Sequence, residues 1–100
     1  MKSGYKIEWT DHAISELSNT LEYLRINWTE KEIQKLVIQL EKTIEIISHN
    51  PFIFQASEEK KDLRRAVILT LNTLYYRIVD ERVEILSFFN NRLNPSKRKI

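Results

Sequence analysis

The side chains with the clearest capacity for chemistry lie in the second half of the chain and are mostly cationic. The candidates for contact with a target are Arg64, Arg65, Tyr75, Arg77, Arg92, Lys97 and Arg98. A guanidinium group binds phosphate or carboxylate through paired N–H donors and stacks on aromatic rings. We therefore expect this set to hold an anionic partner. The alternative is a solvated surface whose arginines only cover neighbouring apolar side chains.

The distribution of charge agrees with an anionic partner. Residues 7–50 contain four cations and eight acids, a net charge of −4, whereas residues 60–100 contain ten cations and four acids, a net charge of +6. Such an asymmetry indicates a surface that meets an anionic molecule. It is equally compatible with attraction between the two halves of the fold.

Other kinds of site find little support in the sequence. His12 and His49 lie far apart, and neither has a second metal ligand four residues away. The absence of cysteine excludes disulfides and thiolate zinc sites, and no nucleotide-binding loop or hydrolase nucleophile motif is present. Acidic side chains lie three residues from cations, as solvated pairs, at Glu22–Arg25, Glu32–Lys35 and Lys42–Glu45. We expect no metal and no cofactor.

Length and hydropathy indicate one domain spanning residues 1–100. No apolar run approaches the roughly eighteen residues that a membrane helix needs, so we expect no membrane partner. The N-terminal segment "MKSGYKIEW" has no apolar signal core. We therefore expect a cytoplasmic protein.

The first half of the chain is predicted to hold a short strand and two helices. Tyr5, Ile7 and Trp9 alternate as on one face of a strand. Thr10 then stands where a helix N-cap belongs, and this helix should end near residue 26 or 27. A capping box from Thr29 to Glu32 starts the second helix, which Pro51 ends. A connection of about two residues predicts an antiparallel helical hairpin.

The period of the apolar residues changes from 3.6 to 2 in the second half. The segments "LRRAVIL", "TLYYRIV" and "RVEILSFF" are predicted strands joined by short hairpin turns. The predicted order is therefore β-α-α-β-β-β, an α+β fold with the helical hairpin on one face of a small, mainly antiparallel sheet. Alternation places Leu74 and Tyr76 in the core, and Tyr75 and Arg77 on the open face.

Several apolar side chains remain on the helices once the core is assigned. They are Tyr23, Ile26, Ile38 and Ile46, all away from the predicted core faces. Single exposed apolar residues are ordinary, but several on one helical hairpin indicate a protein partner.

In order and spacing these segments resemble the RelE/ParE superfamily of toxins from bacterial type II toxin–antitoxin modules, and its ParE-like branch in particular. The resemblance is carried by "IEWTDHAISEL", Pro51, "LRRAVI", "YYRIVD", "VEIL" and "FFNNRLNP". It implies a toxin of the plasmid-stabilisation type that forms a hetero-oligomer with a cognate ParD-like antitoxin. The antitoxin would pack along the helices and sheet, over Tyr23, Ile26, Ile38 and Ile46.

Two activities occur in this superfamily. RelE-like members cut mRNA on the ribosome with open-face cations, which here would be Arg65, Arg77 and Arg92, and with a proton-transferring tyrosine after the last strand. ParE-like members inhibit DNA gyrase. Asn72 stands where a further arginine would be expected, and no tyrosine or histidine follows Phe89.

From these departures we expect a gyrase inhibitor without catalytic residues of its own. A ribosome-dependent mRNA endonuclease is the alternative. A non-toxic module that only binds its partner is a third possibility.

Overall fold

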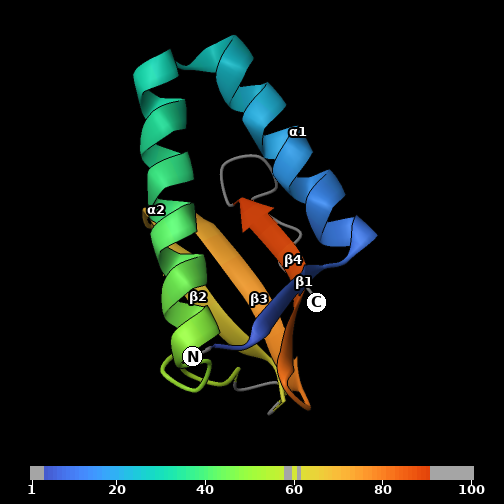
Figure 1. Ribbon diagram of the computed structural model, residues 1–100. Coiled ribbons are helices and arrows are strands. Elements are labelled where there is room, and N and C mark those ends of the chain that lie inside the picture. Colours follow the sequence, from blue (N-terminus) through green and yellow to red (C-terminus); the bar gives the residue numbers. More distant parts are fainter. Residues whose placement is uncertain (1–3, 58–59, 61, 91–100) are drawn as a thin grey trace.

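A computed structural model describes residues 4–57, 60 and 62–90 (Figure 1). Its elements are β1 (Lys6–Trp9), α1 (Asp11–Asn27), α2 (Glu30–His49), β2 (Arg64–Ile68), β3 (Asn72–Val79) and β4 (Arg82–Asn90). The predicted order of elements is confirmed. The predicted target contacts Arg92, Lys97 and Arg98 lie outside the described residues.

The four strands form one sheet in the order β1-β4-β3-β2. β2 pairs with β3 and β3 with β4 in antiparallel fashion, whereas β1 runs parallel to β4. A parallel pair needs a long crossover connection. The chain between β1 and β4 contains both helices, which are joined at one end and lie on the same face of the sheet (Figure 1). The predicted mainly antiparallel α+β fold is thus confirmed.

Local signals in the sequence fix the starts of both helices. The Thr10 hydroxyl accepts a hydrogen bond from the Ala13 N–H at 3.1 Å and donates one to the Ile85 carbonyl at 3.0 Å. The cap therefore also ties the start of α1 to β4. The Thr29 hydroxyl accepts a bond from the Glu32 N–H at 3.4 Å, so the second predicted cap is also present.

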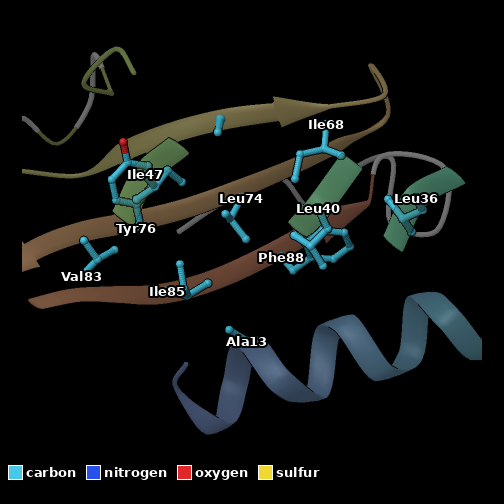
Figure 2. Packing of buried hydrophobic residues seen from close by; sticks show 11 residues of the cluster. Ala13, Leu36, Leu40, Ile47, Ile68, Leu74, Tyr76, Val83, Ile85 and Phe88 are labelled. Carbon is cyan, nitrogen blue, oxygen red and sulfur yellow. The ribbon is translucent and has the colours of Figure 1, made fainter. Parts of the chain in front are cut away.

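The main core lies between the helices and the sheet (Figure 2). Its buried members include Leu36, Leu40, Ile47, Leu74, Tyr76, Ile85 and Phe88. The Tyr76 hydroxyl donates a hydrogen bond to the Pro51 carbonyl at 2.7 Å. Burial of this phenol raises its pKa to about 12. Tyr76 thus holds the start of the α2–β2 connection against the core.

A second, smaller cluster lies on the other face of β3, where the sequence predicted an open surface. Tyr75 is only 8% exposed and packs with Leu63, Leu86 and Phe89. The prediction that Tyr75 stands accessible among the arginines was therefore wrong. Its cluster partners Leu63, just before β2, and Phe89, late in β4, are both distant from it in sequence.

The pairing of β3 with β4 contains a β-bulge. Tyr75 pairs with Ser87 but Tyr76 pairs with Ile85, so Leu86 is the extra residue. One carboxylate oxygen of Glu16 accepts hydrogen bonds from the Ser87 hydroxyl at 2.5 Å and the Phe88 N–H at 2.9 Å. A side chain of α1 therefore satisfies two donors of β4 that lie beyond its last pair with β1, Trp9 with Ile85.

Candidate partner-binding surfaces

Arg64 acts mainly on its own chain. Its guanidinium donates a hydrogen bond to the Phe54 carbonyl at 2.7 Å and lies over the Phe52 ring, 5.2 Å from the centroid. Arg64 of β2 pairs with Tyr76 of β3, so the two side chains lie on the same side of the sheet. The two residues together hold the segment that follows α2. Arg64 thus lies on the core side of the edge strand β2, not on the open face, and is already engaged.

Arg65 is the arginine of β2 that reaches the open face. It pairs with Tyr75 across β2 and β3, and paired residues of an antiparallel ladder point to the same side. Its side chain is exposed, and within the described part of the chain it forms no ion pair. Arg65 is therefore a cation available to a partner, beside the covered ring of Tyr75.

Arg77 also stands on the open face, but it belongs to a row of charges that crosses three strands. Its Nε lies 2.8 Å from Oε1 of Glu84. Arg82 bridges Glu84 at 3.1 Å and Glu8 of β1 at 3.1 Å. Hydrogen bonds from Arg77 and then Arg82 lower the pKa of the Glu84 carboxyl. Hydrogen bonding to Glu84 likewise raises the pKa of Arg82.

The role of Glu84 was not predicted from the sequence, although a signal was present. A two-residue turn at Asp80 and Glu81 places Val79 opposite Arg82, and two steps further Arg77 falls opposite Glu84. Opposite charges at directly paired positions attract each other. The register of one short hairpin therefore already indicated that Arg77 has a partner within the chain.

Asn72 has no access to the open face. It is 5% exposed, donates a hydrogen bond to the Ile68 carbonyl at 3.1 Å and accepts one from the Asn90 side chain. The position at which the resemblance led us to expect an arginine is thus a buried amide pair between β3 and β4. A substrate on the open face would find no side chain from this position.

The four surplus apolar residues on the helices do not form one groove. Tyr23 lines a small cleft of about 100 Å³ together with Trp28, Leu36 and residues of the β2–β3 turn. Ile26 is 73% exposed on α1, and Ile38 and Ile46 are also exposed, on α2. Tyr23 therefore belongs to a cleft at the tip of the helical hairpin, and the three isoleucines to the outer surfaces of the helices.

A larger apolar groove of about 510 Å³ runs between β1 and α2. Its lining residues are Ile7, Trp9, Leu40, Glu41, Ile44, Glu45, Ser48 and His49. β1 is an edge strand, and Lys6 and Thr10 direct their N–H groups to β4. Alternate residues of a parallel strand turn their backbone groups the other way. The edge of β1 that faces away from β4, at Ile7 and Trp9, therefore borders the groove. This surface was not predicted from the sequence.

Two further features limit the kinds of site. No cluster of three or more histidine or acidic side chains among the described residues is arranged to hold a metal ion. None of the helices in the described part of the chain is both long enough and apolar enough to span a membrane.

Of the predicted solvated ion pairs, Glu22–Arg25 forms at 3.4 Å, whereas Glu32–Lys35 and Lys42–Glu45 are not among the ion pairs of the described residues.

Comparison with known proteins gives a result for structure alone. No protein-family model matches the sequence, and a search of curated proteins finds no match. A chain of the chromosomal ParDE TA system from P. aeruginosa superposes with a TM-score of 0.71 at 12% identity, over 86% of this chain and 95% of that one.

Two further solved structures are similar. The E. coli DinJ–YafQ toxin–antitoxin complex contains a chain that superposes with a TM-score of 0.63 at 10% identity, over 92% of this chain and 98% of that one. The solution structure of the conserved hypothetical protein HP0894 from Helicobacter pylori gives a TM-score of 0.58 at 18% identity, over 88% and 96%. The chain thus has the RelE/ParE-like α+β fold, and at the level of the fold the predicted resemblance is confirmed.

Proposed function

We propose that this chain is a ParE-like toxin of a type II toxin–antitoxin module, which binds and inhibits DNA gyrase in the cytoplasm. The likeness in fold to a chain of a ParDE TA system, over nearly the whole length of both chains, supports the toxin assignment. Fold alone does not distinguish inhibition from RNA cleavage. That choice depends on the charges of the open face.

The observation that favours inhibition is the ion pair between Arg77 and Glu84. Cleavage by attack of a 2′-hydroxyl needs cations that are free to stabilise the charge developing on the phosphate. A carboxylate 2.8 Å from the Arg77 guanidinium neutralises that cation and would repel a phosphate. With Asn72 buried, Arg65 is the free arginine of the described open face. Such a surface suits adhesion to an acidic protein surface better than phosphate chemistry.

The antitoxin is the second partner in this proposal. Both the ParDE and the DinJ–YafQ structures are named as toxin–antitoxin assemblies. We place the antitoxin of this chain on the helical side, over Tyr23, Ile26, Ile38 and Ile46, and in the groove beside β1. Burial of the exposed apolar groups there supplies the driving force for binding.

Expression of the chain without an antitoxin tests the proposal. We expect arrested growth, induction of DNA-damage signalling and intact mRNA. Arg65→Glu should relieve the arrest, whereas Arg25→Glu, which also reverses an exposed arginine but on α1, should not. Codon-specific mRNA cuts would instead support the endonuclease that uses Arg65, Arg77 and Arg92. A folded chain with no effect on growth would identify a non-toxic binding module.

A further inference from the structure

The open face of the sheet carries acidic side chains among its cations. Arg77 of β3 pairs with Glu84 of β4, and Glu84 pairs with Glu8 of β1. Arg82 lies two positions before Glu84 and pairs with Lys6. Directly paired residues, and residues two positions apart on one strand, point to the same side of a sheet. All five side chains therefore stand on the face away from the helices.

Both acids form ion pairs with arginines of this face. Oε1 of Glu84 lies 2.8 Å from Nε of Arg77, and Oε2 of the same carboxylate lies 3.1 Å from Nη2 of Arg82. Oε1 of Glu8 lies 3.1 Å from Nε of Arg82. The charges thus alternate in sign from β1 through β4 to β3. We call the four residues the charged row; in order they are Glu8, Arg82, Glu84 and Arg77.

The charged row is accessible, and Glu84 stays ionised near neutral pH. The side chains of Glu8, Arg82 and Arg77 are 44%, 37% and 45% exposed, whereas that of Glu84 is 18% exposed. Hydrogen bonds from Arg77 and then Arg82 hold the pKa of the Glu84 carboxyl below its usual value. A partner that approaches the open face therefore meets carboxylates as well as guanidinium groups.

A nucleic-acid backbone is a line of charges of one sign, and the charged row does not match it. Phosphates that approach either arginine of the row come close to a carboxylate, and like charges brought together oppose binding. Stacking of bases on aromatic rings would offset this repulsion only if such rings were accessible. Tyr75 and Phe89, the rings of the second cluster, are 8% and 4% exposed.

Stability is a weak reason for two acids at these positions. Glu8 and Glu84 are directly paired, and like charges opposite each other destabilise a sheet. Arg82 offsets that repulsion, but exposed ion pairs contribute little to the stability of a fold. The effect of the two carboxylates on binding is therefore larger than their effect on folding.

We propose that Glu8 and Glu84 are specificity-determining residues of the open face, which exclude nucleic acid from it. A protein surface can place a lysine or arginine opposite each carboxylate, whereas a phosphate chain cannot. The described strands present two acids and four cations on this face, a net charge of +2, and the cations are Lys6, Arg65, Arg77 and Arg82. Without the two acids the net charge becomes +4, which attracts polyanions. The inference rests on the proposed function where it takes the open face as the target-binding surface.

The test measures binding of a fluorescein-labelled oligouridylate of 20 nucleotides by fluorescence anisotropy in 50 mM salt. We expect Glu8→Gln/Glu84→Gln to bind at least about tenfold more tightly than the wild-type chain, because Arg77 and Arg82 become available to phosphates. The slope of log affinity against log salt concentration should become more negative by about 0.7 for each further phosphate contact. Adding Arg77→Gln to the double variant should remove most of the gain.

A matched control separates the charged row from net charge. Glu22→Gln/Glu30→Gln changes the net charge by the same amount and releases Arg25 from its ion pair on α1, and it should leave the affinity for RNA within about twofold of the wild-type value. Circular dichroism confirms that each variant is folded. If the loss of Glu84 unfolds the chain, Glu8→Gln alone, which replaces an exposed side chain, should still tighten binding about threefold.

Equal affinity of the wild-type chain and Glu8→Gln/Glu84→Gln, or an equal gain in the matched control, would overturn the inference. Failure of the proposed function has a different readout, because the binding assay requires no effect on growth. A chain whose double variant gains affinity for RNA but which does not arrest growth would refute only the toxin assignment. A chain that arrests growth but whose double variant gains no affinity would refute only the exclusion of nucleic acid.

Discussion

Replacement of Glu16 by alanine should destabilise the protein more than any other loss of an α1 carboxylate. The carboxylate is the acceptor for the Ser87 hydroxyl and the Phe88 N–H at the β-bulge. Ser87 and Phe88 are each 1% exposed, so both donors would remain buried without a partner. A hydrogen bond to a charged group contributes roughly 1.5–3 kcal/mol.

The Glu16 side chain is 25% exposed, so water will replace part of what is lost. We therefore expect Glu16→Ala to lower the free energy of unfolding by about 2–4 kcal/mol, a large share of the roughly 5–15 kcal/mol that holds a typical domain together. This corresponds to a fall in Tm of roughly 10–30 °C for a domain of this size. Glu16→Gln keeps one acceptor oxygen and should cost about 1 kcal/mol.

Urea denaturation followed by tryptophan fluorescence measures these values, with Glu22→Ala as the control. Glu22 is on the same helix and exposed, and its ion pair within the described residues is with Arg25. Its loss should change stability by no more than about 0.5 kcal/mol. In a double-mutant cycle, Ser87→Ala should remove part of the cost of Glu16→Ala. If Glu16→Ala were no worse than Glu22→Ala, the carboxylate would not be supporting the bulge.

Three further predictions concern single groups. Hydrogen bonding to Arg77 lowers the pKa of Glu84 in the folded state. The ionised carboxylate therefore stabilises the fold above the pKa of an unfolded glutamate, and this stabilisation is lost as pH falls through the lower folded-state pKa. Glu84→Gln should flatten the acid side of a plot of urea midpoint against pH. Tyr76→Phe should cost about 1–2 kcal/mol, because it leaves the Pro51 carbonyl unpaired. The wild-type chain should also lose stability between pH 10 and pH 12, because the folded phenol, with its raised pKa, stays protonated while the unfolded one ionises. Tyr76→Phe should abolish this loss. Gly4→Ala should cost about 1–3 kcal/mol in the same denaturation assay, because φ is +115° and the new methyl carbon would stand 2.7 Å from a side-chain oxygen of α2; an unchanged midpoint would show that the N-terminal segment moves aside.

The features that sequence predicted well are those with local causes. Thr10 and Thr29 start the helices because each hydroxyl satisfies an N–H a few residues away. Pro51 immediately follows Asn50, the C-cap residue of α2. The change of apolar period marked β2, β3 and β4 with bounds close to those observed. Each of these signals lies within a few residues of the structure that it specifies.

The features that sequence did not reveal depend on contacts between distant segments. Tyr75 is buried in a cluster with Leu63 and Phe89, which are distant from it in sequence. The groove beside β1 exists because β1 pairs with β4 and leaves its outer edge next to α2. The sequence therefore did not show which arginines are available to a partner: Arg64 and Arg77 are engaged within the chain, whereas Arg65 forms no ion pair among the described residues.

The parallel pairing of β1 with β4 also constrains when the fold can form. Lys6 pairs with Arg82 and Trp9 with Ile85, so the first strand has no place in the sheet until the last has been synthesised. Closing a loop of that length costs conformational entropy, and this cost comes before the β1–β4 hydrogen bonds can offset it. Such long-range contacts slow folding. On the ribosome, β1 must therefore wait while the helices and the β2–β3 hairpin form. If the chain is a toxin, this delay is built into its topology, and an antitoxin already present would meet the helices before the sheet is complete.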